Sequence, residues 1–102
     1  MKVSELSGEA LDYWVARAEG VDEKFARFVA GAHAYSSLWA HGGPIIEREQ
    51  IGVGPATRIG GGWAAIIAAA NNDNVHTIYA DTPLVAAMRA YVTREFGDEV
   101  LA

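Results

Sequence analysis

The last third of the chain contains the signal that most restricts the fold: a complete helix with its start, apolar stripe and stop in register. Thr82 can cap this helix, and Pro83 suits its first position, where a missing amide proton costs little. Gly97 is placed to end it. Between these signals, apolar residues recur every three or four positions, at Leu84, Ala87, Met88, Tyr91, Val92 and Phe96. The spacing predicts a helix over residues 82–97 with one face buried in the core.

A second helix is predicted near the N-terminus. Ser7 is a good N-cap, Gly20 supplies a stop, and an apolar stripe runs between them at Leu11, Trp14, Val15 and Ala18. Residues 22–34 fit either a helical stripe or a half-buried strand. We favour a strand, because a lone hairpin later in the chain would be only marginally stable without more strands or another element against it.

The sequence in the middle of the chain predicts short strands and turns. Pro44 can start a helical segment of roughly one or two turns after the Gly42-Gly43 break. Glycine and proline confine any strand in residues 51–59 to a bent or edge position. Residues 63–68 fit a buried strand or the start of a helix, and we assign a strand. Residues 71–74 have the composition of a turn and residues 75–79 that of a strand, so we expect a hairpin.

These elements predict an α+β fold. We expect two helices to lay their apolar stripes on one face of a small antiparallel sheet, because helices and sheets bury their apolar faces against each other. At 102 residues the chain has the length of one domain, and we assign residues 1–102 to it.

The composition limits the classes of partner. The formal net charge of −5 disfavours nucleic-acid binding, which needs lysine and arginine against the phosphates. The longest apolar run, from Trp63 to Ala70, is far shorter than the ~20 residues that cross a bilayer. With no cysteine, disulfides and zinc–thiolate sites are excluded. We therefore expect a cytoplasmic protein with no membrane or nucleic-acid partner; the oligomeric state is left open.

No segment has the residues of a familiar catalytic or cofactor site. Residues 52–57 begin like a dinucleotide-binding loop, but they lack the third glycine, and Pro55 lies where the backbone should approach a pyrophosphate. The three histidines have no close ligand spacing. We predict no metal, no cofactor and no catalytic residue.

The segment from Trp39 to Glu49 is the best candidate for a binding surface. Its glycines let the backbone approach another molecule, its proline rigidifies the turn, and its charges lie beside two isoleucines. The candidate binding residues are Trp39, His41, Gly42, Gly43, Pro44, Glu47, Arg48 and Glu49. Two of them also have a simpler interpretation, which we favour for each taken alone: Trp39 as a core anchor, and Arg48 as an ion-paired residue of a solvated turn.

Three blocks of the chain resemble the phage NinX-like family. They are residues 11–20 (LDYWVARAEG), 39–49 (WAHGGPIIERE) and 82–92 (TPLVAAMRAYV), and their order and spacing match nearly end to end. The resemblance implies a small accessory protein from a phage or prophage genome, acting in the host bacterial cell. It implies no catalytic residue, substrate or cofactor.

Two classes of function follow. We favour a non-enzymatic module that binds a phage or host protein around the Gly42-Gly43-Pro44 turn, because tryptophan and arginine often anchor interfaces. The alternative is a small-molecule-binding protein or small enzyme with His41, Glu47 and Glu49 as acid–base groups in a groove. Convergence of these three side chains on a pocket would favour the enzyme, and an exposed Trp39 would favour the interface.

The charge leads to a first prediction. At physiological salt the purified protein should bind duplex DNA no better than other acidic proteins do, because its net charge of −5 opposes the phosphates. A titration followed by fluorescence anisotropy measures this, and tight, salt-dependent binding would contradict it.

Overall fold

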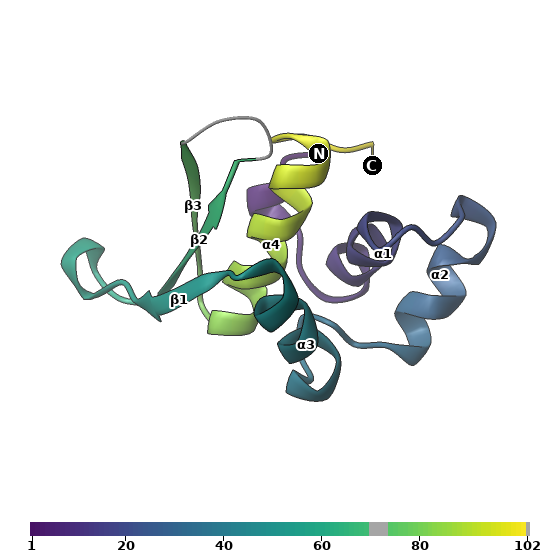
Figure 1. Ribbon diagram of the computed structural model, residues 1–102, viewed down its shortest axis with the longest axis horizontal. Coiled ribbons are helices and arrows are strands. Elements are labelled where there is room, and N and C mark those ends of the chain that lie inside the picture. The colour runs from purple at the N-terminus through teal and green to yellow at the C-terminus, as the bar shows by residue number, and fades with distance from the viewer. Residues whose placement is uncertain (70–73, 102) are drawn as a thin grey trace.

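The computed structural model describes residues 1–69 and 74–101. Along the chain the elements are η1 (Val3–Glu5), α1 (Gly8–Ala18), α2 (Glu23–Ala32), α3 (Trp39–Glu49), β1 (Gly52–Pro55), η2 (Thr57–Ile59), β2 (Trp63–Ala68), β3 (Val75–Ala80) and α4 (Pro83–Phe96) (Figure 1). They form an α+β fold, as the sequence predicted.

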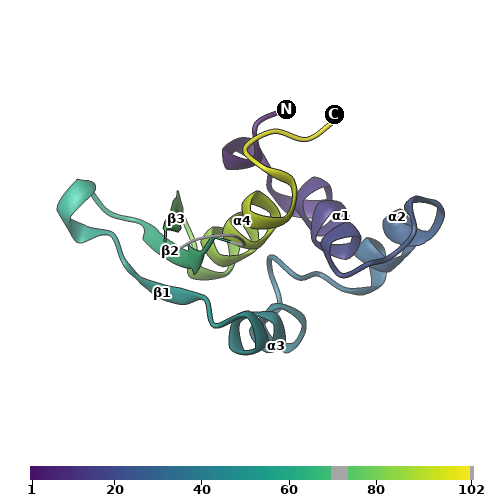
Figure 2. The ribbon, with the colours of Figure 1, turned by 45° about the horizontal axis from the view of Figure 1, so that its top comes forward.

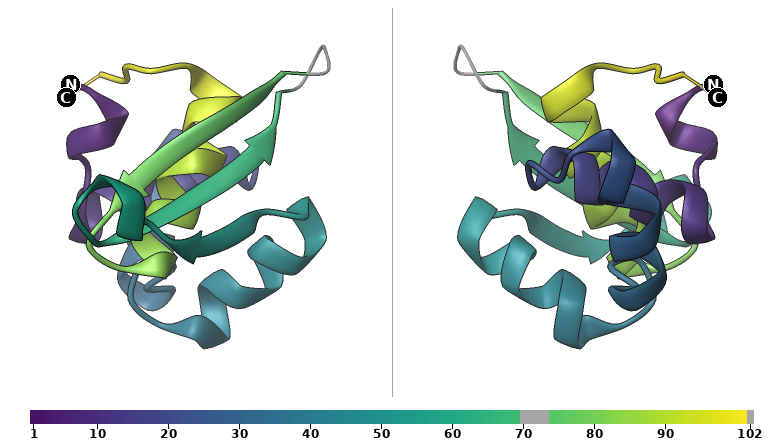
Figure 3. Two further views of the ribbon diagram at one scale, coloured as in Figure 1. Left: turned by 90° about the vertical axis from the view of Figure 1, so that its left-hand side faces the viewer. Right: turned by 90° about the vertical axis from the view of Figure 1, so that its right-hand side faces the viewer.

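The strands form an antiparallel sheet in the order β1-β2-β3 (Figure 3). Gly54 pairs with Ala64, and Ala64 pairs on its other side with Tyr79. The predicted strands in residues 63–68 and 75–79 and their hairpin pairing are confirmed, and β1, with its glycines and Pro55, lies at an edge as expected. Of the predicted turn, residues 71–73 lie outside the described residues.

α4 lies at the centre of the molecule, between the sheet and α1 (Figures 1 and 2). Its predicted signals are confirmed: Thr82 Oγ1 accepts a hydrogen bond from the Val85 amide at 3.1 Å, and Gly97 follows the last turn with φ +91°. Residues on both sides of the helix are buried, which are Leu84, Ala86, Ala87, Met88, Ala90, Tyr91, Val92 and Thr93. The helix therefore joins two layers rather than covering one.

The predicted pair of helices on one sheet face is wrong in two respects. The described residues contain four α-helices, and α1 packs on α4 and α2 while α4 covers the sheet. The sheet needs no further strand, because the helix against it already buries its inner face.

The predicted strand in residues 22–34 is also wrong, because these residues form α2. Asp22 caps the helix by accepting the Lys24 amide at 2.9 Å, a local signal that the strand assignment overlooked. Small residues, Ala26 and Ala30, are the buried ones. The phenylalanines that suggested a half-buried strand point outward, with Phe28 79% exposed.

The predicted start of a short helix at Pro44 is wrong as well. α3 begins at Trp39 and runs through both glycines and the proline to Glu49. Tertiary packing overrides these weak helix formers, because Gly42 and Ile45 are buried.

The two chain ends lie side by side next to α4 (Figures 1 and 2). The Met1 amino group donates to the Val100 carbonyl at 2.8 Å, and the Val3 amide donates to the Asp98 carbonyl at 2.9 Å. These bonds hold η1 against the end of the last helix.

The burial of α4 yields a second prediction. Met88 is fully buried, so Met88→Asp should lower the unfolding free energy by about 3–5 kcal/mol by placing an unpaired charge in the core. Met88→Leu conserves the volume and should cost less than about 1.5 kcal/mol. Urea denaturation measures both; equal stability of Met88→Asp and wild type would contradict the packing described here.

Candidate functional site

The eight candidate binding residues all lie on α3, but they do not share one face. Successive residues of an α-helix are rotated by about 100° around its axis, so residues four apart lie on one side. Trp39, Gly43 and Glu47 therefore form an outer side. Gly42 and Glu49, seven residues apart, share the side toward α4. His41 and Arg48, also seven apart, share the side toward α1 and α2.

The outer side of α3 exposes a large aromatic side chain. Trp39 is 55% exposed, so its predicted role as a core anchor is wrong; its neighbour Leu38 is 52% exposed. A Cβ at Gly43 would lie 3.8 Å from Cε3 of the indole, so the ring rests along the helix above this glycine. Glu47 and Pro44 are exposed.

A pocket of about 420 Å³ lies beside Trp39. It is formed where the start of α1, the loop before α3 and the start of α4 meet, and its lining residues are Gly8, Ser36, Ser37, Trp39, Thr82, Pro83, Leu84 and Val85. The indole thus forms one wall of a mainly apolar hollow.

The side toward α4 uses Gly42 for close packing. A Cβ at this position would overlap the carbonyl oxygen of Tyr35 and would lie 2.6 Å from Cδ1 of Leu84. On the same side, Glu49 accepts a hydrogen bond from Arg94 of α4. The close approach of backbone that the glycine allows is therefore used inside the molecule.

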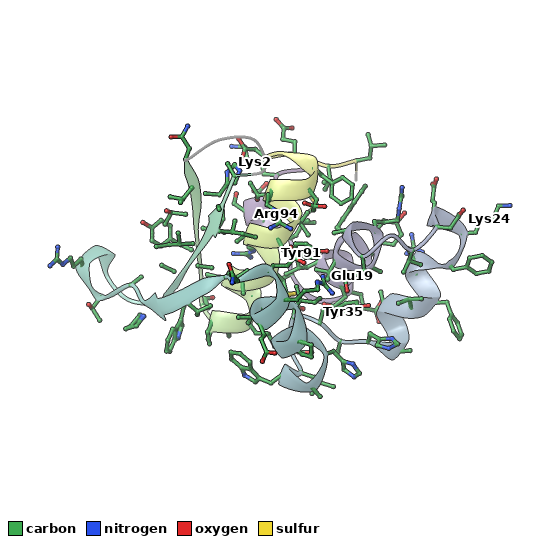
Figure 4. All side chains as sticks on the ribbon, in the orientation of Figure 1. Lys2, Glu19, Lys24, Tyr35, Tyr91 and Arg94 are labelled. Carbon is green, nitrogen blue, oxygen red and sulfur yellow. The ribbon has the colours of Figure 1, made fainter. Side chains whose placement is uncertain are left out.

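The side toward α1 contains a network of charged groups centred on Arg48. Its guanidinium forms an ion pair with Glu19, at the end of α1, and with Glu49. The Tyr91 hydroxyl donates to Glu19 Oε2 at 2.6 Å and accepts from Arg48 at 3.3 Å. Figure 4 shows Glu19, Tyr91 and Arg94 gathered where α1, α3 and α4 meet. The predicted ion pair of Arg48 is confirmed, although the residue lies on a helix and not in a turn.

The network shifts the pKa of its members. Burial would raise the pKa of Glu19, but the hydrogen bonds from Arg48 and Tyr91 outweigh it and lower the pKa. The hydrogen bonds from Arg48 and Arg94 lower the pKa of Glu49. Burial and the bond to Glu19 raise the pKa of Tyr91. Both carboxylates are therefore held ionised at neutral pH, which suits neither to proton transfer.

A buried aspartate orders the loop before α3. Asp12 is 4% exposed, and its Oδ1 accepts the Ser36 amide at 2.8 Å. Burial raises the pKa of this carboxyl. In the same region the His33 ring stacks on Tyr35 at 5.8 Å and meets His41 edge-on at 4.9 Å. His41 is thus packed against the residue that follows α2.

Sequence reasoning missed Asp12, Glu19 and Tyr91, which position α3. Asp12 and Tyr91 fall within the helical patterns predicted between Ser7 and Gly20 and over residues 82–97, and nothing local distinguishes a helix residue that bonds to a distant partner from one that meets solvent. Of the three, Glu19 had the clearest local signal of a partner. It lies at the end of the first predicted helix, where a carboxylate interacts unfavourably with the helix dipole and a nearby cation would offset this.

Comparison with known proteins identifies the family to which the chain belongs. Residues 2–95 match a family model described as bacteriophage P22, NinX. The chain belongs to this family. The matched NinX region contains every element described above except the last residue of α4, so the resemblance seen in three sequence blocks is confirmed over nearly the whole fold. No curated protein matches the chain.

Membrane-spanning helices and metal-binding groups are both absent from the described residues of this NinX family member. None of their helices combines the length and apolar character needed to cross a bilayer. No three histidine, aspartate or glutamate side chains among them lie close enough together to hold a metal ion.

The packing at Gly42 gives a third prediction, with Gly43 as a matched control on the same helix. Gly42→Ala should lower the unfolding free energy by about 1–3 kcal/mol, because the new methyl group overlaps backbone that cannot move freely. Gly43→Ala should raise it by up to about 1 kcal/mol, because alanine favours helix and meets Trp39 at ordinary contact distance. Equal effects of the two substitutions in thermal denaturation would contradict this packing.

The charged network gives a fourth prediction. Since folding lowers the pKa of Glu19 from its ordinary 4.5, its ionised form stabilises the fold above that pH, and this contribution is lost as the pH falls through the folded pKa. Glu19→Gln should therefore cost about 1–2 kcal/mol at pH 7, and its deficit relative to wild type should shrink in acid. Glu23→Gln, at an exposed position on α2, serves as the control. A deficit that stays constant down to pH 3 would contradict the network's role.

Proposed function

We propose that this NinX family member is a non-enzymatic interaction module of phage or prophage origin that binds a phage or host protein through the start of α3. The contact surface in this proposal, called the α3 surface below, consists of Leu38, Trp39, Gly43 and Glu47.

The exposure of Trp39 carries the proposal. A tryptophan that is 55% exposed leaves a large apolar area in water, and tryptophan is enriched among the residues that dominate binding energy at interfaces. Its ring rests above Gly43, so little ordering of the side chain is needed on binding. Leu38 extends the apolar area.

The pocket beside Trp39 suggests what the partner inserts. At about 420 Å³ and with a mainly apolar lining, it suits an apolar side chain of the partner. Glu47 on the α3 surface and the net charge of −5 favour a partner with basic residues around that side chain.

The other candidate residues have supporting roles in this proposal. Gly42 sets the distance of α3 from α4, and Arg48 and Glu49 hold the helix to α1 and α4. His41 steadies the side toward α2. Pro44 stiffens the middle of the helix at an exposed position.

The arrangement gives no support to acid–base catalysis by these residues. Glu47 lies on a different side of α3 from both His41 and Glu49, and Arg48 and Arg94 hold Glu49, so the three side chains do not converge on one site. The lowered pKa of Glu49 further disfavours it as a proton donor. The volume of the pocket, however, falls in the range of small-molecule sites, which keeps binding of a small ligand as the second candidate.

A quantitative pull-down from host cells tests the proposal. Trp39→Ala should lose about tenfold or more of one specific partner while the melting temperature changes little, because the side chain is half exposed. Phe28→Ala is the matched control, since it removes an exposed aromatic side chain from α2 and should retain the same partner.

Two outcomes would contradict the proposal. Unchanged recovery of every partner by Trp39→Ala would exclude the α3 surface as the interface. A thermal shift of wild type, but not of Trp39→Ala, by a small metabolite in the absence of protein partners would instead favour the small-molecule site.

A further inference from the structure

The two edges of the sheet differ in how they are protected. β1 is a four-residue edge strand with Gly52, Gly54 and Pro55, residues that disfavour pairing with another strand. β3 is a six-residue edge strand with no proline, glycine, lysine or other side chain of fixed charge. Natural proteins usually blunt such edges, and here Arg89 and the N-terminal segment lie at the Tyr79 end of β3, so the open Val75–Thr77 part requires an explanation.

The hydrogen-bonding pattern identifies the free groups of β3. The Ala69 amide donates to the Asn74 carbonyl, and the antiparallel ladder therefore directs the backbone groups of His76, Ile78 and Ala80 toward β2. Those of Val75, Thr77 and Tyr79 point away from the sheet. Among the described residues, Arg89 donates to the Tyr79 carbonyl at 3.2 Å, and the backbone groups of Val75 and Thr77 have no backbone partner on that side.

We infer that β3 is a self-association edge, which pairs antiparallel with β3 of a second copy of the chain. In the register with the longest overlap, Thr77 lies opposite Thr77 of the copy on a two-fold axis, and Val75 lies opposite Tyr79. All three residues direct their outward backbone groups toward the axis, as such pairing requires, and Arg89 has to move from the Tyr79 carbonyl for the Val75–Tyr79 pair to form.

The side chains on the outer face of the sheet are self-complementary in this register. Val75 is 55% exposed and Tyr79 is 48% exposed, and both lie on the face away from α4. Placing the valine of one copy opposite the tyrosine of the other forms a β-branched–aromatic pair, one of the stabilising cross-strand combinations. Each copy contributes one valine and one tyrosine, so the same pair forms twice in the dimer.

The inner face brings a polar side chain of one copy to a polar pocket of the other. The same register places His76 of the copy opposite Ile78. Ile78 lines an open pocket of about 330 Å³ whose other lining residues are Lys2, Val3, Ser4, Thr93, Asp98 and Glu99. An imidazole N–H entering there would find hydrogen-bond acceptors in the carboxylates of Asp98 and Glu99, a contact that an unrelated apolar strand would lack.

Sedimentation velocity over a concentration series tests the association. Wild type should form a dimer, and Thr77→Pro should weaken dimerisation by about tenfold or more, because proline removes a free amide without breaking a bond to β2. Thr77→Ala keeps the amide and should still dimerise. Ile66→Lys, on the outer face of the central strand, should also dimerise, because Ile66 is 47% exposed but not at the edge.

Single cysteines test the register in a chain that contains no cysteine of its own. Thr77→Cys should cross-link to itself under mild oxidation, since paired α-carbons about 5.5 Å apart suit a disulfide. Val75→Cys should not, because the two positions would lie about 13 Å apart along the strands. Thr57→Cys, exposed on η2, reports random collision.

Several results would overturn the inference. If wild type stays monomeric at every concentration, β3 does not pair with a second copy, and an extended segment of another protein becomes the remaining candidate for this edge. Dimers that survive in Thr77→Pro but not in Ile66→Lys would show packing through the sheet face instead. Cross-linking of Thr77→Cys no faster than that of Val75→Cys or Thr57→Cys would exclude the register.

Discussion

The sheet and α1 contact α4 from different sides, so most of the core depends on the burial of this one helix. Met88, Val92 and Ala87 are fully buried, and the inner residues of β2, Ala65 and Ile67, belong to the same cluster. A sheet this small is stable only when its apolar face packs against another element. Because α4 supplies that cover and also receives α1 and α3, its contacts determine where the sheet, α1 and α3 lie.

The charged groups at the junction of α1, α3 and α4 stabilise the fold. Because they are bonded to one another, they are poorly suited to acid–base catalysis. Arg48 joins Glu19 to Glu49, and Tyr91 adds a nearly buried hydroxyl to the same network. A carboxylate held ionised by two partners has little tendency to exchange protons at neutral pH. The residues that looked most like an acid–base set are therefore those that position the helix carrying Trp39.

Two separate places on the described surface are proposed to receive other molecules. One is the α3 surface with the pocket beside Trp39, and the other is the free edge of β3. The first suits a partner that inserts a side chain, and the second suits a strand, here that of a second copy. A dimer formed through β3 would present two α3 surfaces at once, which would strengthen binding to a partner with repeated sites.

The sequence by itself determined the elements whose signals are local. The cap and stop of α4, the β-branched content of β3 and the family resemblance could all be recognised without coordinates, as could the edge position of β1. Tertiary structure alone decided that the alanines of α2 face inward, that α3 runs through Gly42 and Pro44, and that Trp39 faces solvent. The reason is physical: periodicity shows that a segment has an apolar face, but which face is buried depends on the element packed against it, which can be far away in the chain. Gly42 lies against Leu84 and Arg48 against Glu19, and no local pattern contains such pairs.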